Sequence, residues 1–342
     1  MTFEKRFITK ARQQVHSKSV GFLLGAGSSY LDGAGYPLAA QLWDVVKPAL
    51  PLNDQKTIQG QIDSGCPGLE EALDRLDEGA QGEVQLRHRV ASAVAEKFRT
   101  LIPPLDHHRA FVRGLSSRRE RRVAIFNLNY DPLIERAADE ESLLLADGFW
   151  GANKAFFVPN SFEYRLGLPG RRLGKAVVDP IRGIINLYKL HGSMGWFLDT
   201  NGCVRRGRPE DPTPAGARVL MIPPHQRKAR DTGFPPYSTL WSEFRGVLAN
   251  DQRRLLSRLI CVGYGMRDTH VNPVLEAARA RSNFTLIILA KSLSDVEFNY
   301  WKNYDNVIIA TETRCALYRE EGPGIIEVWS FEWLAKEVNS NA

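Results

Sequence analysis

The sequence lacks paired cysteines, long apolar runs and an apolar leader, and each absence excludes a class of protein. Its four cysteines stand far apart without a CxxC pair, so we expect no zinc ribbon, no disulfide framework and no bound metal. A reducing cytoplasm is the simplest location for such a chain. No stretch of about 18 consecutive apolar residues occurs, and the first twenty residues are basic and polar. We therefore expect neither a membrane span nor a secretory signal. The cysteines are Cys66, Cys203, Cys261 and Cys315.

The chain is basic, with 45 Lys and Arg against 39 Asp and Glu and a formal net charge of +6. Much of the excess lies in three clusters, which are typical both of solvated turns and of proteins that bind nucleic acid or an acidic partner. The clusters have no interleaved aromatic residues, which favours the solvated surface over binding of a single strand. Nucleic acid as a partner stays undecided. The clusters are Arg118, Arg119, Arg121 and Arg122; Arg171, Arg172 and Lys175; and Arg205, Arg206 and Arg208.

Six short apolar runs alternate with helical patterns along the chain. This alternation favours a parallel sheet covered on both faces. We therefore predict an α/β fold: a Rossmann-like parallel sheet with helices on both faces, plus a smaller helical lobe. The predicted strands are residues 20–24, 122–126, 184–188, 259–262, 284–289 and 307–310.

The helical lobe is predicted around residues 50–120, a mostly helical region between the first and second strands. We expect residues 1–17 to be an N-terminal segment, 18–320 the Rossmann-type domain with this insertion, and 321–342 a C-terminal helix or tail. Two regions rich in Gly, Pro and Arg predict long loops or lids. They are residues 145–182 and 199–236.

A glycine-rich turn, Gly25-Ala26-Gly27-Ser28-Ser29, follows the first predicted strand. Glycines let backbone N–H groups approach a pyrophosphate, and the N-terminus of the following helix adds partial positive charge. The spacing differs from the GxGxxG dinucleotide fingerprint, so a tight structural turn stays open as the alternative.

Polar residues also follow the second strand, in Asn129-Tyr130-Asp131-Pro132. Ligands of open α/β sheets bind beyond the carboxyl ends of the strands, which suits Asp131 as a partner of a ligand amide. Asp131 also suits the N-cap of a helix that has Pro132 as its first residue. Both roles can hold at once.

His191 ends the third strand, and Gly263-Tyr264-Gly265 ends the fourth. A histidine at a strand end is well placed to be a general base, although a structural histidine is the plainer interpretation. Asp268 is expected to cap the helix that follows. Four polar or glycine-rich strand ends in one sheet predict a single nucleotide-sized crevice.

Taken in order, these motifs resemble those of the sirtuin family, specifically the sirtuin-like enzymes of bacterial anti-phage defence systems. The resemblance spans residues 18–320. The matching segments are Gly25-Ala26-Gly27 with Ser29, similar to GAGxS; Ala34-Gly35-Tyr36-Pro37, similar to AGxP; Asn129-Tyr130-Asp131, similar to Asn-x-Asp; Leu190-His191-Gly192-Ser193, similar to Leu-His-Gly-Ser; the late loop Gly263-Tyr264-Gly265 through Asp268; Pro223-Pro224; and the helix containing Trp241.

Two departures from the sirtuin deacetylases alter the activity that the resemblance implies. Leu38-Ala39-Ala40 replaces the Asp-Phe-Arg that follows AGxP, and the four zinc cysteines are missing. The expected activity is therefore hydrolysis of NAD⁺ to nicotinamide and ADP-ribose. The alternatives are a protein deacylase or ADP-ribosyltransferase on the same site, or a catalytically inactive subunit that binds nucleotide or nucleic acid.

The resemblance also assigns roles to residues. Asp131 would bind the nicotinamide carboxamide, Asn129 would orient the ribose or water, and His191 would be the base. Defence enzymes of this kind form homo-oligomers or work with an ATPase of the HerA type, and this chain has no GxxxxGK[ST] motif of its own. The residues expected to bind NAD⁺ are Gly25, Ala26, Gly27, Ser28 and Ser29 at the pyrophosphate, and Gly263, Tyr264 and Asp268, of which Gly263 and Tyr264 face the adenosine half.

Overall fold

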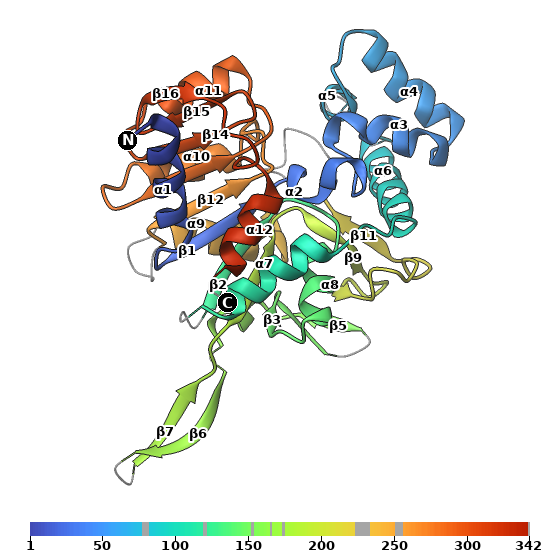
Figure 1. Cartoon of the computed structure of the whole chain (residues 1–342). Coiled ribbons are helices and arrows are strands. Elements are labelled where there is room, and N and C mark those ends of the chain that lie inside the picture. The colour runs from blue at the N-terminus through green and yellow to red at the C-terminus, as the bar shows by residue number, and fades with distance from the viewer. Residues whose placement is uncertain are drawn as a thin grey trace.

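The computed structural model places the chain in two sheets, a projecting hairpin and a helical lobe (Figure 1). The predicted match Pro223-Pro224 and the basic residues Arg119 and Arg121 lie outside the described residues. The structure describes residues 1–76, 82–118, 122–151, 154–164, 166–172, 175–222, 233–249 and 256–340.

A large, mostly parallel sheet forms the centre of the molecule. Within the described residues its strand order is β16-β15-β14-β13-β12-β1-β2-β8-β3. Neighbours from β14 to β3 run parallel, and only β15 and β16 are antiparallel, at one edge. All six predicted strands lie in this sheet, with ends that differ by at most one residue. The strands are β1 (Val20–Leu24), β2 (Arg122–Asn127), β3 (Leu145–Ala146), β8 (Ile184–Lys189), β12 (Arg258–Val262), β13 (Thr285–Leu289), β14 (Val307–Ala310), β15 (Arg314–Leu317) and β16 (Glu320–Pro323).

Helices cover both faces of this sheet, which confirms the predicted α/β class. Successive residues of β1 point to opposite faces: Phe22 and Leu24 join one buried cluster, and Leu23 joins the other. Because both faces are buried, the strands are continuous apolar runs rather than alternating ones. One face is covered by α1 (Phe3–Val15), α7 (Asp106–Ser116), α8 (Leu133–Glu140) and α12 (Phe331–Asn339), and the other by α9 (Tyr237–Ala249), α10 (Val271–Arg279) and α11 (Asp295–Lys302).

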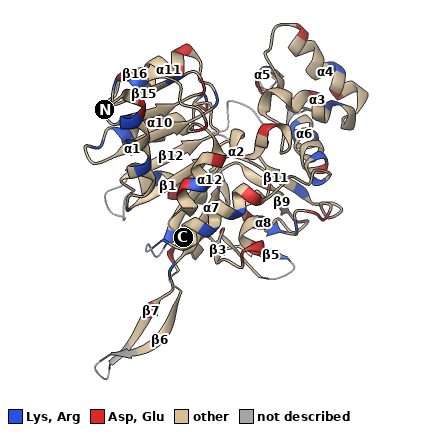
Figure 2. Ribbon diagram, viewed as in Figure 1, with Lys and Arg blue, Asp and Glu red and all other residues tan. Residues whose placement is uncertain are grey.

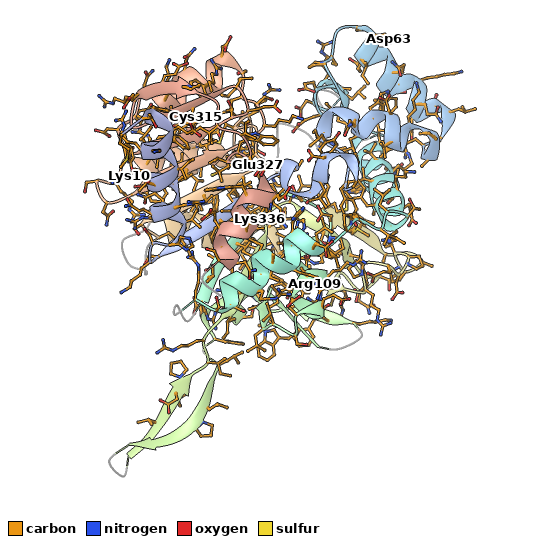
Figure 3. All side chains as sticks on the ribbon, viewed as in Figure 1. Lys10, Asp63, Arg109, Cys315, Glu327 and Lys336 are labelled. Atoms are coloured by element: carbon orange, nitrogen blue, oxygen red, sulfur yellow. The ribbon has the colours of Figure 1, made fainter. Side chains whose placement is uncertain are left out.

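Four helices form a lobe beside the sheet, and its apolar core continues into Met194 of β9 and Val219 and Met221 of β11 (Figure 1). Asp63 marks the outer end of α4 in this lobe (Figure 3). Helix α7 falls inside the predicted 50–120 insertion, yet it packs on the large sheet against α12. The domain boundaries themselves stay a prediction. The lobe helices are α3 (Leu42–Val46), α4 (Leu52–Asp63), α5 (Leu69–Leu76) and α6 (Gly82–Arg99).

The prediction of a long loop was wrong for much of residues 145–182, whereas the described part of 199–236 contains only two short strands. These regions supply strands to a second, antiparallel sheet of order β11-β9-β10-β5-β4 and to a hairpin that projects from the body (Figure 1). The strands are short and rich in Gly, Pro and Arg, so their composition looks like that of loops. They are β4 (Phe149–Trp150), β5 (Ala155–Phe157), β9 (Gly192–Leu198), β10 (Val204–Arg206), β11 (Arg218–Met221), and β6 (Gly167–Arg172) with β7 (Lys175–Pro180) in the hairpin.

Short helical turns complete the described elements, and none of the described helices is both long and apolar enough to cross a bilayer. The turns are α2 (Gly27–Tyr30), η1 (Leu31–Gly33), η2 (Ala39–Gln41), η3 (Lys47–Ala49) and η4 (Pro159–Glu163).

Several residues of the basic clusters are tied into the fold. Arg122 donates to the Phe162 carbonyl over 2.7 Å, and Arg205 and Arg206 form ion pairs, the latter with Asp147. Lys and Arg are interspersed with Asp and Glu over the helices (Figure 2). These contacts give Arg122, Arg205 and Arg206 a structural explanation.

Candidate functional site

The turn after β1 packs directly against the turn after β12. The Gly27 N–H donates to the Gly263 carbonyl over 2.8 Å. A Cβ atom at Gly25 would lie 2.6 Å from the Gly263 oxygen, and one at Gly27 would lie 2.7 Å from the Gly263 Cα. Gly263 also has a φ of +66°, which favours glycine. Contact between two backbones therefore explains three of the glycines that were predicted to bind NAD⁺.

Asn129 joins the end of β2 to the turn after β1. Its Nδ2 donates to the Ser29 hydroxyl over 2.8 Å, the Ser28 hydroxyl over 3.2 Å and the Gly25 carbonyl over 3.0 Å. Asn129, Ser28 and Ser29 are all buried. Three predicted site residues therefore meet in one hydrogen-bonded group.

Asp131 is buried at the start of α8, where its Oδ1 accepts from the Leu133 N–H over 3.2 Å. The prediction that Asp131 is the N-cap and Pro132 the first helical residue was wrong by one position. Pro132, at φ −97° and ψ 25°, is the N-cap, and the helix begins at Leu133. The carboxylate still caps the helix from one residue earlier. Its charge also adds to the effect of burial, which raises the pKa of Tyr36.

Lys189 and Glu135 form a buried ion pair behind Asp131. The Lys189 side chain is fully buried, lies 3.3 Å from the Glu135 carboxylate and donates to the backbone carbonyl of Asp131. Burial raises the pKa of Glu135, and the charge of Lys189 partly opposes the change. Sequence reasoning missed this pair. A lysine within an otherwise apolar strand was the available signal.

His191 lies buried just beyond β8. Its Nδ1 is 3.1 Å from the Leu128 carbonyl, and its Nε2 is 3.6 Å from Oδ2 of Asp268. The Trp241 ring lies at 6.2 Å between centroids, and its indole N–H donates to the Leu190 carbonyl. The histidine is therefore held between the ends of β2 and β12.

The loop after β12 is fixed by hydrogen bonds among its own residues. Oδ1 of Asp268 accepts from the N–H groups of His270 over 2.9 Å and Val271 over 3.3 Å. The N-cap of α10 is His270, two residues later than the predicted cap, and the carboxylate binds the start of the helix from outside it. The Tyr264 hydroxyl accepts from the Asp268 N–H over 2.9 Å and donates to Asn272 over 3.0 Å. Burial, with the Asp268 charge, raises the pKa of Tyr264 well above its usual range.

A charge from α5 of the helical lobe acts on tyrosines of this site. Burial raises the pKa of Tyr130, and the charges of Glu70 and Asp268 add to this effect. Glu70 contributes to the raised pKa of Tyr264 as well. The Tyr130 hydroxyl donates to the Ile222 carbonyl over 2.5 Å.

The structure thus gathers the predicted residues of all four strand ends. We use the term strand-end site for the set Gly25–Ser29, Asn129, Asp131, His191, Gly263, Tyr264 and Asp268, which contacts link from β1 through β2 and β8 to β12. Ala26 lies within the glycine turn, and its carbonyl accepts from the Ser29 N–H. Away from the strand-end site, a cavity of about 370 Å³ lies between α6 and β11. His88, Arg89 and Arg218 are among the residues that line it.

The four cysteines are free, and three of them are buried. Cys315 lies in β15, in the part of the molecule away from the lobe (Figure 3). Among the residues that the structure describes, no three His, Cys, Asp or Glu side chains come together as a metal site would require.

Comparison with known proteins agrees with this arrangement. Residues 123–309 match the family model described as a SIR2-like domain, which is more than half of the 342-residue chain. The chain belongs to the SIR2-like family. No curated protein matches the sequence.

Two solved structures are similar overall. One is a Sir2 homologue mutant in complex with 2′-O-acetyl ADP-ribose, with 15% identity, 82% of each chain covered and a TM-score of 0.43. The other was solved in work on the mechanism and regulation of Sir2 enzymes, with 12% identity, 98% of this chain and 97% of that chain covered, and a TM-score of 0.45. These overlaps are too loose to match individual residues.

Proposed function

We propose that this SIR2-like protein is an NAD⁺ glycohydrolase, which cleaves NAD⁺ to nicotinamide and ADP-ribose. The observation that carries the proposal is the buried His191, 3.1 Å from the Leu128 carbonyl at the end of the strand that also bears Asn129 and Asp131. A base, an amide and a carboxylate at neighbouring strand ends suit attack of water on a bound nucleotide.

The leaving group explains why a single base suffices. Cleavage breaks the bond between the ribose C1′ and the nicotinamide nitrogen, and the electron pair leaves with the ring. The ring is already a pyridinium cation, so it departs neutral and needs no general acid. The pair of carboxylic groups that most glycosidases use is therefore not required. The water oxygen bonds to C1′, and its proton goes to His191.

The contacts of Asn129 narrow its proposed role. Its Nδ2 is engaged by the Gly25 carbonyl and the hydroxyls of Ser28 and Ser29. Orientation of the ribose or the water therefore falls to its carbonyl oxygen, Oδ1. We propose that Asp131 accepts a hydrogen bond from the nicotinamide amide while it caps α8.

The glycine turns keep a role in the proposal through their close packing, because the N–H groups of Gly25, Gly27, Ser28 and Ser29 already donate to carbonyl oxygens. We propose that the segments Gly25–Ser29 and Gly263–Tyr264 bind the NAD⁺ pyrophosphate and adenosine half. The biological setting rests on the resemblance alone: depletion of NAD⁺ in anti-phage defence, in the cytoplasm, as a homo-oligomer or with a HerA-type ATPase.

Incubation of the purified full chain with NAD⁺ tests the proposal. Chromatography should detect nicotinamide and ADP-ribose in equal amounts, and His191→Ala is the negative control. Nicotinamide release that needs an acetyl-lysine peptide would indicate a deacylase, and labelling of protein by ADP-ribose would indicate a transferase. Binding of NAD⁺ without release of nicotinamide would indicate an inactive nucleotide-binding subunit.

A further inference from the structure

Asp268 divides its two carboxylate oxygens between two tasks. Oδ1 accepts the His270 and Val271 N–H groups at the start of α10. Oδ2 lies 3.6 Å from Nε2 of His191. The side chains of His191 and Asp268 are 5% and 9% exposed, so little water screens the charge of the carboxylate. The backbone therefore fixes an anion beside the histidine ring.

The contact of Nδ1 determines the tautomer of His191, and hence whether Nε2 is free to take a proton beside Asp268. Nδ1 of His191 lies 3.1 Å from the Leu128 carbonyl, which can only accept, so Nδ1 carries a hydrogen. Nε2 of the neutral ring is then the basic nitrogen. When it takes a proton, the new N–H and the positive charge both face Asp268.

We propose that Asp268 is a positioning residue that stabilises the protonated state of His191 during turnover. This inference rests on the proposed hydrolysis, in which the attacking water gives its proton to Nε2. It differs from the role in NAD⁺ binding that the sequence assigns to Asp268. A carboxylate disfavours a nearby pyrophosphate anion, whereas it favours an imidazolium.

Two further carboxylates, those of Glu70 and Asp131, belong to the same part of the molecule. Glu70 of α5 approaches the same region from the lobe and raises the pKa of Tyr130 and Tyr264 together with Asp268. Both tyrosines therefore stay neutral over the working pH range. Asp131 follows the end of β2, and the neutral Trp241 ring of α9 lies 6.2 Å from the His191 ring between centroids. Asp268 is the carboxylate in direct reach of Nε2.

The substitution Asp268→Asn tests the inference because asparagine caps a helix about as well as aspartate. The variant keeps the fold and loses the charge. We expect kcat to fall by about 10- to 100-fold, part of what a positioned base contributes, with KM nearly unchanged. The acidic limb of the kcat profile should move to lower pH, because His191 without the anion gives up its proton more readily.

Asn272→Ala is the matched control in the same loop. It removes the bonds of Asn272 with Tyr264 and Met266 without altering a charge. The acidic limb should stay in place even if the melting temperature falls. Asp268→Glu keeps the negative charge, so its acidic limb should lie closer to the wild-type position than that of Asp268→Asn.

A second measurement separates this inference from the proposed function. NMR titration of the seven histidines, with His191 assigned by comparison with His191→Gln, requires no turnover. The pH midpoint of the His191 titration should be lower by about one pH unit or more in Asp268→Asn than in the wild-type protein. An unchanged midpoint would overturn the inference whether or not the protein cleaves NAD⁺. If Asp268→Asn raised KM and left the acidic limb of the kcat profile in place, the inference would also be overturned, and Asp268 would be a residue that binds NAD⁺.

Discussion

The strand-end site and the helical lobe are held in different ways. In the site, Asn129 and His191 bond to backbone groups from other segments of the chain, and Asp268 accepts from backbone N–H groups of its own loop. The lobe instead has an apolar core that continues into β9 and β11, with exposed contacts such as the Gln59–Asp63 hydrogen bond at its surface. Substitutions in the site should therefore alter activity, stability or both, whereas surface substitutions in the lobe should alter neither much.

The largest effect on activity is expected at His191. His191→Ala should lower NAD⁺ cleavage by about 10²–10⁴-fold, because the proton of the attacking water has no acceptor. Turnover measured beside thermal melting checks the prediction. His107→Ala is the matched control, since His107 is partly exposed and lies near Glu332 rather than at the strand ends. Unchanged turnover in a folded His191→Ala would remove His191 from the catalytic role.

The largest effect on stability is expected at the buried pair behind Asp131. Lys189→Met should cost about 3–5 kcal/mol in free energy of unfolding, because the Glu135 carboxylate stays buried without its partner. The double variant Lys189→Met with Glu135→Leu should recover part of this loss in chemical denaturation. If the double variant lost as much stability as Lys189→Met, the buried charge of Glu135 would not be the cause of the loss.

The same pair predicts a pH dependence. Burial raises the pKa of Glu135 in the folded state. A carboxyl group with a higher pKa in the folded state than in the unfolded state adds to the free energy of unfolding below its unfolded pKa. This contribution is lost as pH rises through its folded pKa. Without Lys189 the folded pKa rises further, so the Lys189→Met deficit should shrink as pH falls toward about 4. Melting curves of both proteins against pH measure this difference.

Substitutions of Asn129 and of Asp131 should differ in their effect on stability. Asn129→Ala removes three buried hydrogen bonds, so it should lower activity and also cost about 1–3 kcal/mol in stability. Asp131→Asn keeps a capping oxygen and should lower only activity. Turnover and melting temperature are measured on each variant. Wild-type turnover in Asp131→Asn would leave Asp131 as a helix cap alone.

A smaller effect is expected at the glycines. Gly27→Ala places a Cβ 2.7 Å from the Gly263 Cα and should cost about 1–3 kcal/mol, because the two turns must move apart. Gly265→Ala is the control, since its Cβ would have no heavy atom within 4 Å. Thermal melting compares the two variants. Equal stability would contradict the close contact of the turns.

The smallest effect is expected in the lobe. Asp63→Ala removes the exposed hydrogen bond between Gln59 and Asp63, one turn apart on α4, so it should cost less than about 1 kcal/mol. Turnover should stay at the wild-type value. A marked loss of activity would show that the lobe surface and the strand-end site are coupled.

The sequence alone predicted the central sheet closely. Continuous apolar runs such as Val20–Leu24 and Val307–Ala310 report local burial on both faces, so their six positions were found to within one residue. The same reasoning placed Asn129, His191 and Asp268 at strand ends, because parallel strands share one carboxyl edge. Burial and edge position are encoded locally, which is why the sequence determines them.

Only the tertiary structure decided which of these groups meet. The register of β8 beside β2, and the fold of the loop after β12, set the 3.6 Å between His191 and Asp268. The same packing brought Gly27 against Gly263, paired Lys189 with Glu135 and joined loop-like segments into a second sheet. These contacts join residues distant in sequence, and their distances depend on the packing of the whole chain. No local pattern of residues records them.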